Sequence, residues 1–456
     1  MNYIDLFAGA GGLSEGFHNA GFTPVAHVEM DAYACDTIRT RLAWYCLHEK
    51  KNYQPYFDYL RGKLPREELY ELIREIKPGL LDSVINEAIG EETRQSIFDR
   101  IDQQLKQLPE GKQEVDLIIG GPPCQTFSVA GRARLGRAVM EKDPRSKLYL
   151  QYARFLVKYR PRMFVFENVL GMLSFRNGQQ LDLIRETFLE AGYAMDVREW
   201  NARSFGVLQS RERLIIIGWR LDQTGLGYPA FGTLTEEEQK RFTVDELLSD
   251  LPPLEPGQIL PHTTRHDPKT VTPYLKWSGL RKKCPVITWH QARPHREEDR
   301  QIYRLFIEHW NDGGDEYQRM RYNELPAHLI FHENKTQFTD RFKVVASDMH
   351  YSQTVVAHIS KDGHYYIHPD IEQRRSLSVR EAARLQSFPD NFYFEGPRTS
   401  ALKQIGNAVP PLMGERIALS VRKALEGTGN FLSPGSRVGK RRSGKTDKQL
   451  ALDYVQ

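Results

Sequence analysis

Short apolar runs alternate with amphipathic stretches through the first half of the chain. The runs at residues 2–7, 23–31, 115–119 and 162–169 have the length and the bounding residues of buried strands. A helix is predicted at 147–159, directly before the last of these strands. Strands that alternate with helices in this way predict an α/β fold with a mainly parallel sheet.

A long charged stretch interrupts this alternation. From about residue 32 to residue 112 the sequence becomes polar and helical. Segments such as 66–74 and 96–105 carry apolar residues three and four positions apart, as amphipathic helices do. We interpret residues 45–112 as a helical insertion, a structural region without visible chemistry.

The residues after 220 lack the regular alternation of strands and helices. We therefore predict a first domain at 1–220 and a smaller domain of mixed structure at 221–375. The capping box at 378–381 and the helix signals beyond it predict that residues 376–427 return to the first domain. The last segment, 428–456, combines basic residues with Gly and Ser, and we expect it to be disordered.

A glycine-rich turn follows the first predicted strand. Its glycines, Gly9, Gly11 and Gly12, would let a ligand approach the backbone closely. Glu29, at the end of the second strand, is well placed to accept hydrogen bonds from ribose hydroxyls. A dinucleotide site is poorly supported, because its fingerprint requires glycine where this chain has Ser14. A plain turn beside a surface carboxylate remains the alternative.

The loop after the strand at 115–119 presents a single thiol, Cys124. Two glycines and two prolines precede it, so the loop is sharply turned and stiff. A thiol needs such a positioned, electropositive setting to act as a nucleophile at neutral pH. A lone cysteine is more often an inert buried residue, and this alternative stays open on the loop alone.

Two further predicted strands carry polar residues at one of their ends. The strand at 162–169 delivers Glu167 near its carboxyl end, the edge at which parallel sheets bind ligands. Residues 209–219 read as another strand, and a period of two places Gln209, Arg211 and Arg213 on one face. The alternative is an edge strand with outward-facing charge.

Composition narrows the classes of protein that remain. The net charge of +4 permits nucleic-acid binding without requiring it. The four cysteines are far apart, which suggests neither a metal site nor a disulfide framework. There is no apolar run of membrane-spanning length and no signal peptide pattern, so we expect a cytoplasmic protein that does not bind membranes.

Six motifs, taken in order, closely resemble those of the DNA cytosine-5 methyltransferases. The resemblance is strong over residues 1–220 and 376–425, and the segment between them is where that family carries its variable target-recognition domain. It implies a Rossmann-like methyltransferase fold. The motifs are Asp5-Leu-Phe-Ala-Gly-Ala-Gly-Gly12, Pro122-Pro-Cys-Gln125, Glu167-Asn-Val169, Gln209-x-Arg-x-Arg213, Arg380-Glu-Ala-Ala-Arg-Leu-Gln-Ser-Phe-Pro389 and Gly406-Asn-Ala-Val-Pro410.

The resemblance implies S-adenosyl-L-methionine as the methyl donor and no metal. Phe7 would stack near the adenine, the glycine turn would surround the methionine part, and Glu29 would accept the ribose hydroxyls. The insertion obscures the family's usual adenine-contacting Asp. The implied cofactor-binding residues are Phe7, Gly9, Ala10, Gly11, Gly12, Glu29, Met30, Pro122, Asn407 and Val409.

The resemblance also implies covalent catalysis by Cys124. Carbon 5 of cytosine is a poor nucleophile, so a thiolate first adds to carbon 6 and generates an enamine that attacks the methyl group. Glu167, held protonated, would donate to ring nitrogen 3, and Arg213 would contact the carbonyl oxygen. Arg211 would either lower the pKa of the thiol or bind a phosphate, and the sequence leaves that choice open.

The implied substrate is double-stranded DNA. Carbon 6 is inaccessible in a stacked duplex, so the target base must swing out. The basic loop at 131–147 is predicted to close on the DNA, with a solvated charged loop as the alternative. Base-edge contacts from residues 221–375 would give specificity. The predicted DNA contacts are Ser128, Arg132, Arg134 and Gln209.

These observations favour a sequence-specific, monomeric DNA methyltransferase that protects DNA from a cognate restriction endonuclease without forming a stable complex with it. Two alternatives remain at this point. The same core would suit methylation of a tRNA cytosine, although the long segment before residue 376 favours DNA. A noncatalytic DNA-binding regulator on the same scaffold would need none of Cys124, Glu167 and Arg213.

Overall fold

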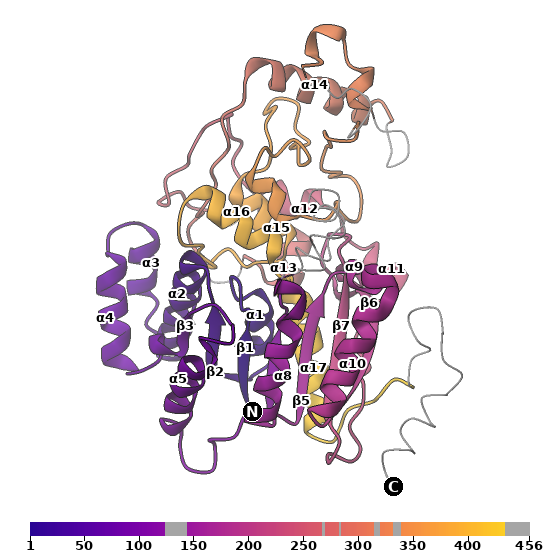
Figure 1. Ribbon diagram of the computed structural model, residues 1–456. Coiled ribbons are helices and arrows are strands. Elements are labelled where there is room, and N and C mark those ends of the chain that lie inside the picture. Colours follow the sequence, from indigo (N-terminus) through magenta and orange to yellow (C-terminus); the bar gives the residue numbers. More distant parts are fainter. Residues whose placement is uncertain (124–143, 267–269, 282–283, 314–319, 332–338, 434–456) are drawn as a thin grey trace.

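A seven-stranded sheet forms the centre of the computed structural model, which describes residues 1–123, 144–266, 270–281, 284–313, 320–331 and 339–433 (Figure 1). The strand order is β3-β2-β1-β4-β5-β7-β6. Only β7 runs antiparallel to its neighbours, so the predicted α/β class with a mainly parallel sheet is confirmed. The strands are β1 (Asn2–Leu6), β2 (Thr23–Glu29), β3 (Val84–Asn86), β4 (Leu117–Gly120), β5 (Met163–Asn168), β6 (Tyr193–Asn201) and β7 (Glu212–Arg220).

The strands form because their apolar side chains are buried on both faces of the sheet. On β5, Phe164 and Phe166 pack into the core on one face, whereas Met163 and Val165 pack into the core on the other. Side chains of a strand alternate between faces, and a strand buried on both sides therefore reads as a continuous apolar run. This pattern is what made the strands visible in the sequence.

Helices cover both faces of the sheet (Figure 1). One face packs against α5 (Arg94–Lys106), α8 (Leu148–Tyr159) and α10 (Gln179–Glu190). The opposite face packs against α1 (Gly12–Asn19) and α17 (Pro411–Leu425), which bring the two ends of the described chain together. The last described helix thus completes the layer begun by the first.

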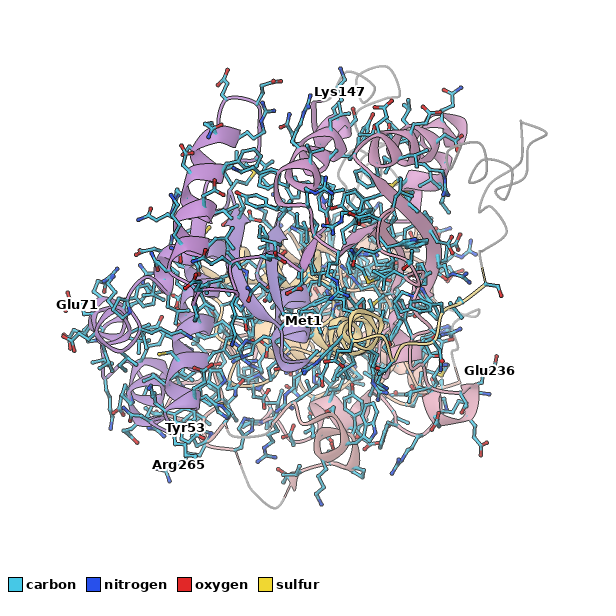
Figure 2. All side chains as sticks on the ribbon, turned by 90° about the horizontal axis from the view of Figure 1, so that it is seen from below. Met1, Tyr53, Glu71, Lys147, Glu236 and Arg265 are labelled. Atoms are coloured by element: carbon cyan, nitrogen blue, oxygen red, sulfur yellow. The ribbon has the colours of Figure 1, made fainter. Side chains whose placement is uncertain are left out.

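The region from residue 32 to residue 112, predicted to be mostly helical, contains one strand of the sheet. It holds α2 (Ala32–Glu49), α3 (Gln54–Leu60), α4 (Arg66–Ile76), a short 3-10 turn η1 (Leu81–Ser83) and then β3, which pairs with β2. Seen from below, Tyr53 and Glu71 of this region lie on the opposite side of the molecule from Glu236 (Figure 2). The sequence did not reveal β3, whose three residues are too few for a periodicity to appear.

Most of the described residues between β7 and α17, among them α12 to α16, lie beyond the carboxyl edge of the sheet (Figure 1). Two helices from the late part of the chain, α15 (Val379–Leu385) and α16 (Arg398–Asn407), share an apolar core with residues 242–280. The other helices and 3-10 turns are η3 (Pro144–Lys147), α9 (Gly171–Ser174), η4 (Phe175–Gly178), η5 (Ala202–Phe205), α11 (Glu236–Gln239), α12 (Asp245–Leu248), α13 (Pro273–Ser278), α14 (Glu297–Asn311), η7 (Tyr322–Glu324), η8 (Ala327–Leu329) and η9 (Ala357–Ser360).

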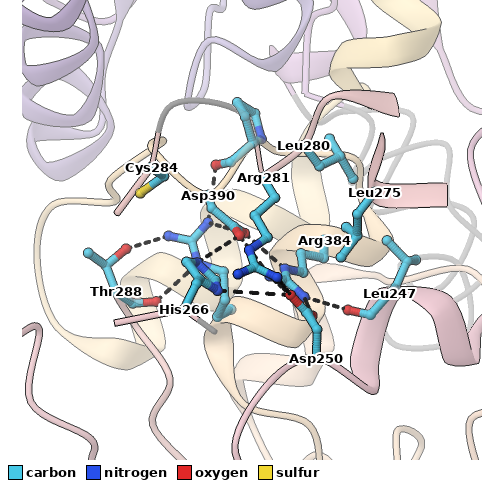
Figure 3. Close-up of polar contacts among 12 residues, drawn as sticks. Leu247, Asp250, His266, Leu275, Leu280, Arg281, Cys284, Thr288, Arg384 and Asp390 are labelled. Carbon is cyan, nitrogen blue, oxygen red and sulfur yellow. Dashed lines mark hydrogen bonds and ion pairs between the residues drawn. The ribbon is translucent and has the colours of Figure 1, made fainter. Parts of the chain in front are cut away.

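A buried charge cluster holds this second part together (Figure 3). The guanidinium of Arg384 on α15 donates to Asp390, with atom separations of 2.7 and 2.9 Å, and also to Asp250. Arg281 donates to Asp250 at 2.8 Å, and Nε2 of His266 lies 3.1 Å from Asp390. Although burial opposes ionisation, Arg384 holds the pKa of Asp390 well below its ordinary value.

Replacing Arg384 with methionine is expected to lower the free energy of unfolding by about 3 kcal/mol, because buried carboxylates then lose their main cation. Urea unfolding followed by circular dichroism measures the change. The matched control is Arg304→Met on α14, which removes an exposed pair with Glu308 and is expected to leave the free energy of unfolding unchanged. Equal stability of Arg384→Met and the parent would contradict this role.

Candidate active site

An ion pair between two neighbouring strands marks the carboxyl edge of the sheet. Glu167 lies near the end of β5 and Arg213 near the start of β7, and the antiparallel pairing brings them together. Nε of Arg213 lies 2.7 Å from Oε1 of Glu167, and both side chains are largely buried. Of the three residues predicted to share one strand face, only Arg213 reaches this carboxylate.

The cysteine loop begins against the same carboxylate. A Cβ on Gly121 would lie 2.7 Å from Oε2 of Glu167, so only glycine fits there without a shift. Nδ2 of Asn168 donates to the carbonyl of Pro122 at 3.4 Å. The description stops at residue 123 and resumes at residue 144. Cys124 itself therefore lies outside the described residues, directly after this fixed beginning of the loop.

A pocket of about 410 Å³ adjoins the ion pair. Arg213 and Glu212 line it from β7, and residues 169–171 line it from the segment after β5. Thr354 reaches the same pocket from a distant part of the chain, and its hydroxyl donates to the carbonyl of Ser210 at 2.5 Å. The pocket is therefore built jointly by the sheet and by the residues beyond it.

The glycine turn lies at the same edge, between β1 and α1. Phe7 adopts a left-handed conformation with φ of 58°, and Gly11 forms the N-cap of α1. A Cβ on Gly12 would lie 2.4 Å from the carbonyl oxygen of Val409, so the segment after α16 closes directly on the turn. Asn407, the last residue of α16, is exposed beside it.

Glu29 faces the turn from the end of β2. Its carboxylate accepts hydrogen bonds from the amides of Gly9, Met30 and Asp31 at 2.8 to 2.9 Å. Burial raises the pKa of Glu29 above its ordinary value, and these donors offset only part of that effect. Met30 is 67% exposed, and a Cβ on Gly9 would meet no atom within 4 Å. The backbone of Gly9 and the apolar side chain of Met30 therefore face open space next to the carboxylate of Glu29.

A family model accounts for most of the chain. The model described as C-5 cytosine-specific DNA methylase matches residues 1–53 and 87–423. The chain belongs to this family. It is a DNA cytosine-5 methyltransferase, and the unmatched residues 54–86 are those that form α3, α4 and the strand β3.

Alignments with similar proteins extend over nearly the whole chain of this methyltransferase. The chain is 40% identical to the type II methyltransferase M.Bpa9945I of Bacillus paralicheniformis, over 94% of this chain and all of the relative. It is 30% identical to the type II methyltransferase M.DdeI of Desulfomicrobium norvegicum, over 92% and 88%. A solved structure of a prophage-encoded E. coli protein, described as a DNA modification methyltransferase, shares the fold with a TM-score of 0.54 at 22% identity, over 93% and 99%.

Two predicted site residues of the methyltransferase are buried structural groups. The amide of Gln209 donates to the carbonyl of Leu385 and to Gln386, and its oxygen accepts from the amide of Val355. With no exposed surface, Gln209 is not placed to contact DNA. The period of two failed because β7 begins only at Glu212, so the residues before it do not alternate between sheet faces.

Arg211 is also fully buried. Its guanidinium donates to the carbonyls of Val355, Gly406 and Ala408 at 2.7 to 3.1 Å. These bonds fix the pocket segment and the segment after α16 to the sheet, and they leave no surface for a DNA phosphate. Of the two roles that the sequence left open for Arg211, a phosphate contact does not fit this burial, and a lowering of the pKa of the Cys124 thiol stays a prediction.

The structure adds residues that the sequence did not reveal. Thr354 and Ser210 line the pocket, yet neither belongs to a pattern that distinguishes it from other hydroxyl residues. Asn86, the last residue of β3, donates to the carbonyls of Glu29 and Met30 at 3.2 and 3.0 Å. Only the pairing of β3 with β2 reveals that contact, which fixes the backbone on the cofactor side of the edge.

Several of the predicted residues lie outside the part of the chain that the structure describes. The predicted DNA contacts Ser128, Arg132 and Arg134, with most of the basic loop at 131–147, lie outside the described residues, as do residues 434–456 of the tail. Among the residues that the structure does describe, no group of three or more His, Cys, Asp or Glu side chains is placed to hold a metal ion. No helix in the same part of the chain is long and apolar enough to cross a membrane.

Proposed function

We propose that this methyltransferase modifies carbon 5 of cytosine at one short sequence in double-stranded DNA, through a covalent bond between Cys124 and an extruded base. The observation that carries the proposal is the Glu167–Arg213 pair beside the pocket, against which the cysteine loop begins. The pair places one negatively charged and one positively charged side chain beside the pocket in which the base would lie. No role in plain DNA binding requires that arrangement.

The proposed chemistry divides one difficult step into two. The thiolate of Cys124 adds to carbon 6, and the electron pair of the carbon 5–carbon 6 bond moves toward carbon 5. Carbon 5 would then form its bond to the methyl group as the bond between that methyl group and the sulfonium sulfur of the methyl donor breaks, with the electron pair going to sulfur. The proton on carbon 5 then leaves to a base, and the thiolate is eliminated. Arg213 stabilises charge on the carbonyl oxygen. We propose that Glu167 donates a hydrogen bond to ring nitrogen 3 as charge develops on the ring.

The residues at the glycine turn fit S-adenosyl-L-methionine. When bound, this cofactor supplies an electrophilic methyl group. The open space in front of Gly9 admits a ligand to the backbone, and Glu29 offers acceptors to ribose hydroxyls. The exposed side chain of Met30 provides an apolar surface for the adenine. Phe7, Ala10, Gly11, Gly12, Pro122, Asn407 and Val409 are proposed to complete the site.

Cofactor affinity is expected to fall as the pH is lowered through the pKa of Glu29. The ionised carboxylate accepts from ribose hydroxyls and the protonated form accepts less well, so affinity is full above this pKa and falls about tenfold per pH unit below it. Burial raises the pKa above 4.5, which moves the loss to higher pH than for an exposed glutamate. Isothermal titration calorimetry with S-adenosylhomocysteine measures the profile.

A Glu29→Gln variant provides the control for this profile. It is expected to bind S-adenosylhomocysteine more weakly and without the acid limb, because glutamine does not titrate. An unchanged acid limb in Glu29→Gln would assign the titration to another group. A parent protein whose affinity does not fall at any acidic pH at which it remains folded would also contradict the role of Glu29.

The proposed substrate complex places duplex DNA across the sheet edge. Most of the described residues of 221–375 lie beyond that edge, and Thr354 lines the pocket, so one segment can contact both the extruded base and the flanking duplex. We propose that this segment reads the target sequence and that residues 376–427 return to the sheet. Ser128, Arg132 and Arg134 remain proposed DNA contacts.

The biological role that we propose is protection of DNA from a cognate restriction endonuclease, which acts on the same site without a stable complex. The support is similarity to type II methyltransferases over more than nine-tenths of the chain. We propose that the enzyme acts as a monomer in the cytoplasm.

Base-resolution mapping of 5-methylcytosine tests the proposal. The chain is expressed in a bacterial host that lacks cytosine methylation, and genomic DNA and tRNA are sequenced separately. Methylation at one short DNA motif is the expected result. Unmethylated DNA from cells that contain folded, cofactor-binding protein would contradict the proposal. If tRNA were methylated instead, the substrate would be tRNA and not DNA.

A further inference from the structure

An exposed arginine lies beside the active-site pocket and takes no part in the proposed methyl transfer. Arg203 belongs to the turn η5, which follows β6 at the catalytic edge of the sheet. Its Cζ atom lies 5.1 Å from the centre of the Tyr351 ring. A guanidinium that stacks on an aromatic ring keeps its donors free while its plane is held.

Hydrogen bonds connect this arginine to the pocket wall. Oδ1 of Asn201 accepts from the backbone amide of Arg203 at 3.2 Å, and Nδ2 of Asn201 donates to the hydroxyl of Ser210 at 3.1 Å. Ser210 lines the pocket that also contains Arg213. The turn that carries Arg203 therefore has a fixed position relative to the pocket.

The stacking partner is fixed to the same wall. The amide of Ser210 donates to the carbonyl of Ser352 at 2.9 Å, and the amide of Ser352 donates to the carbonyl of Leu208 at 3.0 Å. Tyr351 directly precedes this pairing, and Thr354, which lines the pocket, follows it. Arg203 and Tyr351 are thus both held in place at the rim of the pocket.

The charge of Arg203 is not neutralised nearby. Within the described part of the chain, no carboxylate lies within ion-pair distance of its guanidinium, whereas Arg213 is paired with Glu167. An uncompensated, oriented guanidinium matches the geometry of a phosphate. An extruded base in the pocket would carry its own backbone across this rim.

We propose that Arg203 binds a phosphate of the DNA strand that carries the extruded cytosine. The inference rests on the proposed function, because it takes the pocket to be the one that receives the base. It assigns Arg203 to substrate binding and to no step of methyl transfer. Tyr351 is the positioning residue that orients it.

An Arg203→Gln variant tests the assignment with plasmid DNA purified from a methylation-free host. The KM for DNA is expected to rise about tenfold, with kcat within about twofold of the parent. The slope of log affinity against log salt should fall by about 0.9, the value for one phosphate contact. Arg203→Lys should recover most of the affinity and the whole slope. The matched control is Arg74→Gln, an exposed arginine on α4, which should change neither quantity.

Equilibrium binding of the same plasmid, measured by filter retention, keeps this test separate from that of the proposed function. A parent protein that binds the plasmid without methylating it would contradict the proposed function while the salt slopes still test Arg203. An Arg203→Gln variant with the parent's KM and salt slope would overturn the proposal. Unchanged S-adenosylhomocysteine binding by the variant shows that it is folded.

Discussion

A Cys124→Ala variant is expected to lose methyl transfer to DNA by at least about 10⁴-fold, because without the thiolate carbon 5 has no route to an enamine. Binding of S-adenosylhomocysteine should be unchanged, since the thiol of Cys124 is not among the groups proposed to hold the cofactor. Incorporation of a labelled methyl group into plasmid DNA measures the loss. Turnover within about tenfold of the parent would exclude Cys124 as the nucleophile.

A second cysteine distinguishes this chemistry from a general effect of removing a thiol. Cys46 is a free, buried residue of α2, packed in the core between the helices α2, α3 and α4. Cys46→Ala should retain kcat and lose at most about 1.5 kcal/mol of stability, the cost of a small cavity. A comparable loss of activity in both variants would point to misfolding.

A Glu167→Gln variant is expected to lower kcat by about 10³-fold. Glutamine keeps the size of the side chain, but it removes the negative charge that holds Arg213 at 2.7 Å and the group that would carry a proton to ring nitrogen 3. The loss should appear in kcat more than in the KM for DNA, because the interaction strengthens as charge develops on the ring. Single-turnover methylation at saturating DNA separates the two quantities.

Glu199→Gln on β6 is the matched control for this change. Glu199 is an exposed carboxylate on the neighbouring strand and does not line the pocket. Its kcat should stay within about twofold of the parent. A Glu167→Gln variant with the same small effect would remove Glu167 from the proposed chemistry.

Sequence patterns predicted the parts of the fold whose causes are local. β1, β2, β4 and β5 were visible because each is a short apolar run buried on both faces of the sheet. The helix α15 was visible because its capping box joins Ser378 to Glu381, three residues away. The strand β3 was missed, since it has three residues and is defined only by its pairing with β2.

The errors at the candidate site have a common physical origin. Arg211 resembles a catalytic or phosphate-binding residue in the sequence, but its partners Val355, Gly406 and Ala408 lie 144 to 197 residues away. The same holds for Gln209, whose amide is satisfied by Leu385 and Gln386. A local pattern reveals that a polar residue is unusual, but only the tertiary contacts reveal whether it faces a substrate or a buried carbonyl.

The central claim is that Cys124 forms a covalent bond with the target cytosine, and one trapping experiment tests it directly. The chain is incubated with S-adenosyl-L-methionine and a duplex that carries 5-fluorocytosine at the mapped site. Fluorine on carbon 5 cannot leave as a proton does, so the adduct formed after methyl transfer should persist. We expect a complex that survives denaturation, with mass spectrometry of its peptides placing the methylated fluorocytosine on Cys124. A duplex that is bound but never covalently attached, or an adduct at another residue, would contradict the account.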